Sequence, residues 1–168
     1  MAFFYPPVGF HFFVRFEGLL LKYPGIPDIG FQSVSGINAE IGIEEYHEGG
    51  ENRFKHKLPN PVTYQNLVLK RGMLIGSQLM QWFKDSVENY AFEANDITVI
   101  LLNSDHIPIQ AWNFIKAWPV KWDISEFNAE QSTIVVETVE FAYQYFRRID
   151  VTTIALNFAA SVNVNVSI

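Results

Sequence analysis

The chain of 168 residues contains no cysteine, and this absence removes several kinds of site together. Without thiols it has no disulfides, no cysteine nucleophile and no thiolate-bound metal. Charge is also scarce, since Asp, Glu, Lys and Arg make up 18% of the residues and leave a net charge of −6. Proteins that bind duplex nucleic acid usually present a basic face, so this balance argues against that class.

Long apolar runs are missing as well. No segment reaches the length of a transmembrane helix, and the N-terminus MAFFYPPVGF lacks the basic start and uninterrupted apolar centre of a signal peptide. We therefore expect synthesis in the cytoplasm without membrane insertion, whatever particle the chain later joins. No Pro/Ser/Gly-rich or single-sign segment marks a linker, and the length suits one compact domain.

The dominant pattern that is present is the alternation of apolar and polar residues, which is typical of half-buried β-strands. It predicts strands over residues 10–16, 30–44, 67–72, 97–102, 109–125 and 133–149. The 97–102 segment is apolar except for Thr98, so we expect it to be buried on both faces. The last two strands far exceed the usual length of about 5–6 residues, and Pro119 should produce a bulge, bend or edge.

A single convincing helix lies among these strands. Apolar residues recur at helical spacing after Ser77, which is placed to cap the first turn: Leu79, Met80, Phe83, Val87 and Tyr90. One helix and many strands predict a mainly β fold, an antiparallel β-barrel or sandwich with one flanking α-helix. Strands longer than a small barrel needs favour pairing between subunits in a ring.

One stretch, EEYHEGGENRFKHKLPNPV at residues 44–62, concentrates titratable groups around a Gly-Gly pair. Its glutamates would catalyse hydrolysis only if two were held about 5–10 Å apart across a pocket. His47 and His56 match neither the zincin nor the zinc-finger spacing, and Gly49-Gly50 lacks the Lys-Ser/Thr of a phosphate loop. A solvated, charge-mixed loop is the ordinary interpretation. We therefore predict no enzyme, no metal and no cofactor.

Aromatic residues offer another candidate site. Trp112, Trp118 and Trp122 share one parity of the 109–125 strand, and three rings in a row can stack on sugars or bases. Aromatic residues on one face of a strand more often belong to the core. A soluble ligand-binding β-module is therefore the alternative from another functional class.

Several motifs in order resemble the conserved phage tail protein family, and the resemblance spans residues 6–147. They are FQSVSGINAEI, EEYHEGGENRFKHKLPNPVTYQNLVLKRG, the helical LMQWF, AWNFIKAWPVKW and NAEQSTIVVETVEFAYQYF. Members of this family build the inner tubes of contractile phage tails and of extracellular contractile injection systems. The resemblance implies that residues 1–149 form a tail-tube domain. It also implies a structural subunit whose hexameric rings stack into a hollow tube, with sheath, baseplate and other tube proteins as partners and effector cargo or DNA in the lumen.

The resemblance also implies a role for the charged stretch, which in the family reaches from one ring to the next. Acidic residues precede basic ones, so copies can pair in a repeating, head-to-tail manner. The candidate subunit-interface residues are Glu44, Glu45, Glu48, Glu51, Arg53, Lys55, Lys57 and Arg71.

Residues 150–168 continue beyond the family pattern. They carry no charge after Asp150, and their apolar residues alternate: Ile154, Leu156, Phe158, Val162, Val164, Val166 and Ile168. A disordered terminus is one interpretation, although disordered segments usually have low hydrophobicity. The other is an added strand on the chain's own barrel, on a neighbouring subunit or on a partner at the tube end. Such a tail would suit a specialised tube-initiator or tube-end protein at the baseplate, which is the alternative to a bulk tube subunit.

Overall fold

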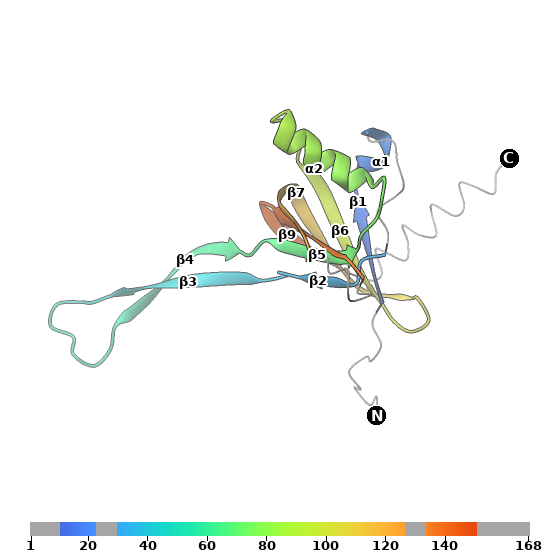
Figure 1. Cartoon of the computed structure of the whole chain (residues 1–168). Helices are drawn as coiled ribbons and strands as arrows, with labels where there is room; N and C mark the ends of the chain where they lie inside the picture. The colour runs from blue at the N-terminus through green and yellow to red at the C-terminus, as the bar shows by residue number, and fades with distance from the viewer. Residues whose placement is uncertain (1–10, 23–29, 127–133, 151–168) are drawn as a thin grey trace, which may run out of the picture.

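The computed structural model describes residues 11–22, 30–126 and 134–150, in which antiparallel strands dominate (Figure 1). The strands are β1 (His11–Phe16), β2 (Ser33–Ser35), β3 (Ala39–Tyr46), β4 (His56–Tyr64), β5 (Leu67–Gly72), β6 (Asn95–Leu102), β7 (Pro108–Ile124), β8 (Val136–Ala142) and β9 (Tyr145–Ile149). The helices are the short α1 (Leu19–Lys22) and α2 (Gln78–Glu88). The mainly β prediction is confirmed. Neither helix is long and apolar enough to cross a membrane.

The main sheet has seven strands in the order β1-β6-β7-β8-β5-β2, and β9 pairs with β7 outside this path. Strand β7 links the two halves: its first half pairs with β6 and β9, and its second half pairs with β8. Within the described residues, β1 and β2 stand at the two ends of the path without pairing to each other. The sheet is therefore open, and the expected closure into a barrel is wrong.

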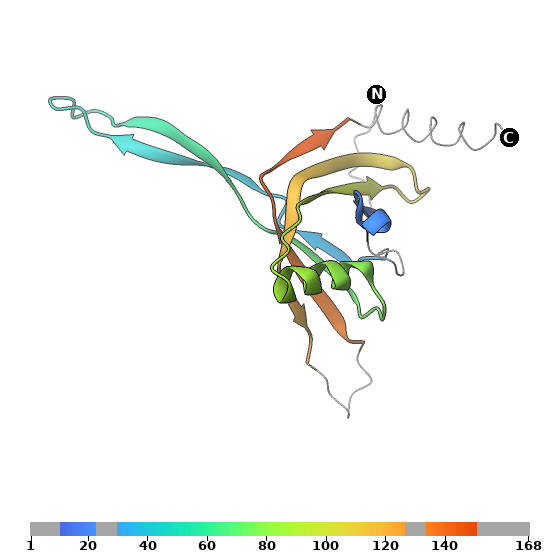
Figure 2. The same cartoon turned by 90° about the horizontal axis from the view of Figure 1, so that it is seen from above.

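The core lies between the sheet and α2. Trp82 of α2 is fully buried and lies beside Phe16 and Phe141, with ring centroids 6.4 and 5.7 Å away. The indole Nε1 of Trp82 donates a hydrogen bond of 3.1 Å to the carbonyl of Glu93, so the polar atom of this buried ring has a partner. Figure 2 shows α2 lying alongside the curved sheet.

Helix α2 begins as predicted, because the Ser77 hydroxyl accepts a hydrogen bond from the backbone N–H of Met80. Its buried face differs from the prediction. Trp82 points inward, while Val87 and Tyr90 are 56% and 80% exposed. The large indole sets the rotation of the helix about its axis, and Tyr90 lies beyond the last helical turn.

Strand β7 does not keep one apolar face throughout. Phe114 is buried, but Trp118 and Val120 are exposed, while Ala117 and Pro119 point inward. Lys116 has a positive φ of 51°, and this irregularity shifts the alternation by one residue. The predicted disturbance at Pro119 is confirmed by a register shift between Pro119 and Lys121.

The predicted strand over residues 133–149 is divided in two. Strands β8 and β9 are separated at Tyr143 and Gln144, and the N–H of Gln144 donates to the carbonyl of Ile115. Both pieces pair with β7, so the chain must bend where β7 bends. The prediction of one long strand was therefore wrong, whereas the length of β7 is confirmed at 17 residues.

A buried ion pair joins the sheet to the helix. The Nε atom of Arg71 on β5 lies 2.9 Å from an Oε atom of Glu137 on β8, and both side chains are 2% exposed. A second guanidinium N–H donates to the Ser77 hydroxyl at 2.7 Å, the same hydroxyl that caps α2. The Phe31 ring lies 5.4 Å from the guanidinium carbon. This one cation therefore connects β5, β8 and the start of α2.

Replacing Glu137 with alanine should lower the free energy of unfolding by about 3–5 kcal/mol, because it leaves a buried guanidinium without this carboxylate. Chemical denaturation monitored by tryptophan fluorescence measures the change. The control is Glu88→Ala, which breaks an exposed pair with Lys84 and should cost no more than about 0.5 kcal/mol. Equal effects of the two substitutions would contradict the assigned role of the buried pair.

Candidate functional site

Strands β3 and β4 form a two-stranded hairpin that projects away from the main sheet (Figure 1). Their register runs from Ala39 opposite Tyr64 to Tyr46 opposite His56, with a bulge between Ile41 and Ile43. The charged stretch of residues 44–62 therefore forms the distal part of this hairpin. Nearly all of its residues are exposed in the single chain.

The pairing gives the hairpin an apolar stripe. Ile41 lies opposite Val62 and Ile43 opposite Pro59, so these side chains share one face. The neighbouring β3 residues Glu40 and Glu44 point to the other face, because side chains alternate along a strand. Exposed large hydrophobic residues occur along the whole hairpin: Ile41, Ile43, Tyr46, Phe54, Leu58 and Val62. Two-stranded hairpins are marginally stable alone, and such exposed apolar surface is typical of an interaction site.

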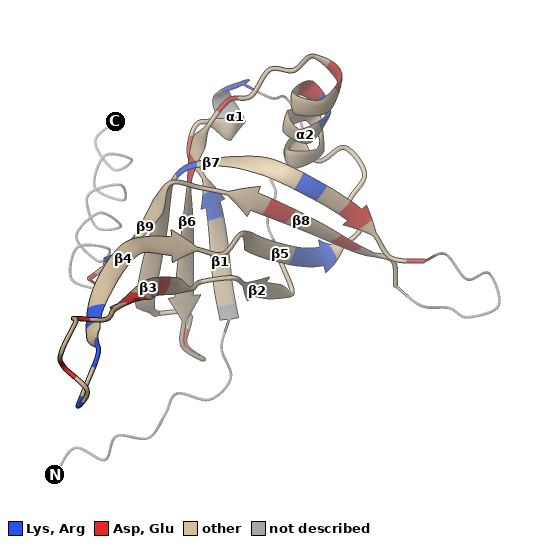
Figure 3. Ribbon diagram, turned by 90° about the vertical axis from the view of Figure 1, so that its left-hand side faces the viewer, with Lys and Arg blue, Asp and Glu red and all other residues tan. Residues whose placement is uncertain are grey.

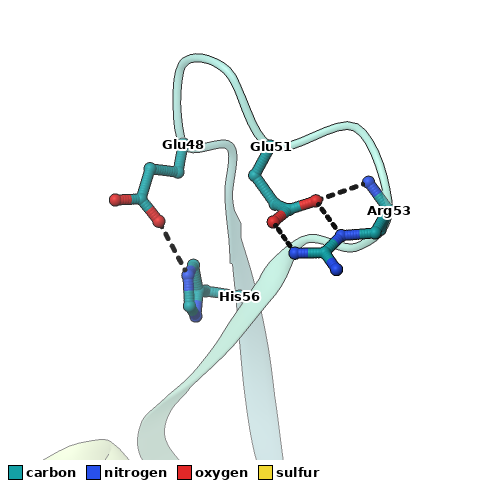
Figure 4. Close-up of polar contacts among 4 residues, drawn as sticks. All are labelled: Glu48, Glu51, Arg53 and His56. Atoms are coloured by element: carbon teal, nitrogen blue, oxygen red, sulfur yellow. Dashed lines mark hydrogen bonds and ion pairs between the residues drawn. The ribbon is translucent and has the colours of Figure 1, made fainter.

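Charges of both signs gather at the hairpin tip (Figure 3). The guanidinium of Arg53 donates two hydrogen bonds, of 2.9 and 2.8 Å, to the carboxylate of Glu51 (Figure 4). Further along, Nε2 of His56 lies 3.1 Å from a carboxylate oxygen of Glu48. These contacts close the tip on itself, so part of its charge is balanced within one chain.

Contacts near the hairpin tip lower the pKa values of two glutamates. A hydrogen bond from Lys55, 3.1 Å away, holds the pKa of Glu45 below its ordinary value, and the nearby charge adds to the effect. The pKa of Glu51 is likewise lowered, chiefly by the side-chain hydrogen bond from Arg53. Both carboxylates therefore stay ionised at neutral pH and keep their cations oriented.

Most of the candidate interface residues lie on this hairpin. Glu44 and Lys57 are exposed there, and Glu45 stands opposite Lys57 in the register. Arg71 does not belong to the group, because its side chain is 2% exposed and is held by Glu137. Sequence reasoning placed Arg71 with the other charges because it lies in the same motif.

The root of the hairpin is aromatic. The Tyr64 ring lies 5.8 and 5.7 Å from those of Tyr143 and Phe146, which follow the bend after β8. The Tyr143 hydroxyl donates to the carbonyl of Gly36 at 3.5 Å. Burial, with a smaller contribution from Tyr64, raises the pKa of Tyr143 to about 12. Sequence reasoning missed this cluster, although the aromatic run YQYF was the available signal.

Gly36 is required at the root for a steric reason. Its φ is +85°, and a Cβ atom there would lie 1.9 Å from the carbonyl oxygen of Asn66. The chain segments entering and leaving the hairpin thus touch at a point where only hydrogen fits. This close approach fixes where the hairpin leaves the main sheet.

Other candidate chemistry does not come together. Across residues 11–22, 30–126 and 134–150, no group of three or more potential metal ligands forms. Trp112 and Trp122 pack against the core, whereas Trp118 lines an open hollow with Phe92 and Ala94. The three tryptophans therefore do not form one stacking platform.

The described residues thus form an open antiparallel sheet from which one exposed hairpin projects. Residues 8–147 match the family model of the T4-like virus tail tube protein gp19, and the chain belongs to this family. The match confirms the resemblance given by the sequence motifs. The family is structural and not enzymatic. No curated protein sequence matches the chain.

Solved structures agree with this assignment. A chain in the anti-feeding prophage baseplate is 27% identical with a TM-score of 0.73, and the alignment covers 88% of this chain and 97% of that one. A chain in the sheath/tube terminator of the PVC extracellular contractile injection system is 27% identical with a TM-score of 0.72, covering 89% and 100%. A type six secretion system protein shares the fold at 13% identity, with a TM-score of 0.55 and coverage of 83% of each chain.

Replacing Gly36 with alanine should destabilise the chain by about 1–3 kcal/mol, because the backbone at the hairpin root must move or remain strained. Equilibrium unfolding in urea measures the loss. Gly49→Ala is the matched control, since no atom lies within 4 Å of its added Cβ, and it should change stability by no more than about 0.5 kcal/mol. A tolerated Gly36→Ala would show that the root is not sterically fixed.

Replacing Lys55 with alanine should raise the pKa of Glu45 toward its ordinary value, since the main cause of the lowering is removed. A lowered carboxylate pKa means that the contact stabilises the hairpin above the ordinary glutamate range and is lost as the pH falls through the lowered pKa. A pH titration of the Glu45 carboxylate, followed by carbon-13 NMR, measures its pKa in the unsubstituted chain and in Lys55→Ala. Lys84→Ala on α2 should leave Glu45 unchanged. An unaltered Glu45 in Lys55→Ala would refute the pairing.

Proposed function

We propose that this chain is a structural subunit of the hollow inner tube of a contractile phage tail or injection system. Family membership gives the class, and the projecting hairpin is the observation that carries the assembly role. Its apolar stripe is exposed in one chain and becomes buried when copies associate. Tube formation supplies the partner that the isolated hairpin lacks.

The subunits assemble as hexameric rings, and the rings stack. Support comes from the 27% identical chain whose structure is described as a six-fold symmetrised baseplate. The hairpin projects from one side of the subunit, so in a repeating assembly it contacts a surface other than the hairpin on the next copy. Such head-to-tail contacts repeat without limit along an axis and produce open filaments. The interface residues on the hairpin are Glu44, Glu45, Glu48, Glu51, Arg53, Lys55 and Lys57.

The charges at the hairpin tip contribute more to the orientation of docking than to its free energy. An exposed ion pair contributes about 0–1 kcal/mol, and several tip charges already have partners in their own chain. Charge pattern therefore selects the docking direction, while the apolar stripe provides most of the attraction. Sheath, baseplate and other tube proteins are the remaining partners, and the lumen carries effector cargo or DNA. The chain is made and assembled in the cytoplasm.

A specialised tube-initiator or tube-end protein is the second candidate. Two observations favour it: residues 148–168 lie outside the family match, and the two 27% identical chains come from a baseplate and from a sheath/tube terminator assembly. An initiator would form rings that stop stacking without a bulk tube protein. Bulk tube remains the first candidate because the family match, residues 8–147, spans most of the chain.

Negative-stain microscopy and sedimentation of the purified chain test the proposal. Rings or stacked tubes are expected at high protein concentration. Replacing Ile41 with aspartate should abolish stacking, because it places a charge in the apolar stripe, whose Ile41 is 58% exposed. Ile107→Asp is the matched control at 57% exposure in the β6–β7 turn, and it should assemble normally. A monodisperse monomer at every concentration would overturn the tube function.

A further inference from the structure

The outer edge of β3 is open to another strand. Within the described residues, β3 pairs only with β4, so the backbone groups along its other side are unpaired. Strand β3 contains neither proline nor lysine over Ala39–Tyr46. Because every residue of this edge keeps its backbone N–H, the edge can accept an added strand, and its charged side chains are Glu40, Glu44 and Glu45.

The opposite edge of the hairpin is blocked. Strand β4 contains Pro59 and Pro61, which lack the N–H needed for a ladder, and Lys57 adds charge. Such residues are the usual means of protecting an edge strand. The hairpin therefore has one edge that can accept a strand and one that cannot.

The C-terminal segment has the matching pattern. Residues 151–168 contain no charge, their even-numbered positions are apolar from Ile154 to Ile168, and Thr, Ala, Asn and Ser occupy the odd positions. Strand β3 has the same two-sided character from Ala39 to Glu44, with Ile41 and Ile43 on one face and Glu40 and Glu44 on the other, whereas Glu45 and Tyr46 at its distal end reverse the pattern. A strand from this segment would place apolar beside apolar and amide or hydroxyl beside carboxylate.

We infer that residues 151–168 of one copy add as a third strand to the open edge of β3 in a neighbouring copy. The inference rests on the proposed tube function and specifies one contact between its subunits. Three strands with a hydrophobic face are stable where two are marginal, so the addition stabilises the projecting arm.

The direction of β9 explains why the acceptor belongs to another copy. Strand β9 begins at Tyr145, beside Phe146 of the hairpin root, and runs toward the opposite side of the molecule (Figure 2). It ends at Ile149 opposite Ala111 of β7. Strand β9 thus ends on the side of the subunit away from the hairpin, which suits a head-to-tail contact between copies.

The segment is long enough for this contact. Extended chain spans about 3.3 Å per residue, so residues 151–168 reach about 60 Å. Pairing along the eight residues of β3 uses less than half of that length. The remainder, on the order of 30 Å, bridges neighbouring subunits.

The contact is an addition to the family fold. The match to the family model ends at residue 147. The two 27% identical chains are covered to 97% and 100%, whereas 88% and 89% of this chain is covered. The proposed third strand therefore lies outside the family match.

Disulfide trapping tests the contact directly, because the chain has no cysteine of its own. One preparation carries Ile43→Cys in β3, and a second, with a different mass tag, carries Val162→Cys or Phe158→Cys in the tail. After co-assembly and mild oxidation, we expect disulfide-linked dimers that contain both tags. Intact mass spectrometry under non-reducing conditions identifies them.

Two controls define the geometry. Asn163→Cys points to the opposite face from Val162, so it should cross-link at least tenfold less with Ile43→Cys. Val62→Cys lies on β4, about 10 Å from the added strand, which is beyond disulfide reach. Equal cross-linking at either control position, or no mixed dimers, overturns the inference.

A deletion separates this inference from the tube function. Removing residues 151–168 should speed amide exchange across Ala39–Tyr46 in assembled particles, with little change in β5. Unchanged protection of β3 overturns the inference even if tubes still form, and the tube function then stands. If the full chain forms no rings or tubes, the tube function fails, and the inference fails with it.

Discussion

The buried contact between Arg71 and Glu137 is the constraint on which the rest of the structure depends. Placing two charges where each side chain is 2% exposed costs hydration free energy, which only close, fully bonded geometry offsets. That requirement fixes β5 against β8 and, through the Ser77 hydroxyl, fixes where α2 begins. The alternation of buried side chains along β5 and β8 acts in the same direction, because a slip of one residue would turn them to the other face. The ion pair permits one register, and β5 leads directly back into the hairpin.

The core sets the direction in which the β3–β4 hairpin projects. Strand β3 continues the path of β2, and strand β5 continues the path of β4. The two strands nearer the core, β2 and β5, pair with each other, and β5 also pairs with β8 in the main sheet. Gly36 allows these two paths to touch, and the Tyr64–Tyr143–Phe146 cluster holds the root against the sheet. The β5–β8 register consequently sets the direction of the arm, and the surface chemistry of the arm can differ from that of the core without disturbing the fold.

Sequence patterns predicted the elements better than their orientation. Alternation located β1, β5, β6 and β7, and the serine before the apolar periodicity located α2. The sequence did not reveal the shift of the apolar alternation at Lys116, because a single residue with positive φ leaves no periodic pattern. Likewise, the contact of Arg71 with Glu137 joins residues 66 positions apart, which no local pattern reports. The charged hairpin was found because its composition is unusual, whereas its apolar stripe depends on a cross-strand register that one strand alone does not define.

The unequal edges of the hairpin also bear on lateral growth. A ribbon with two pairable edges can recruit strands on both sides and grow laterally into an uncontrolled sheet, which is the route to fibrils. With Pro59 and Pro61 on β4, this ribbon can extend laterally only along β3. Lateral growth from one subunit is thereby confined to one edge, which halves the routes to uncontrolled sheet extension.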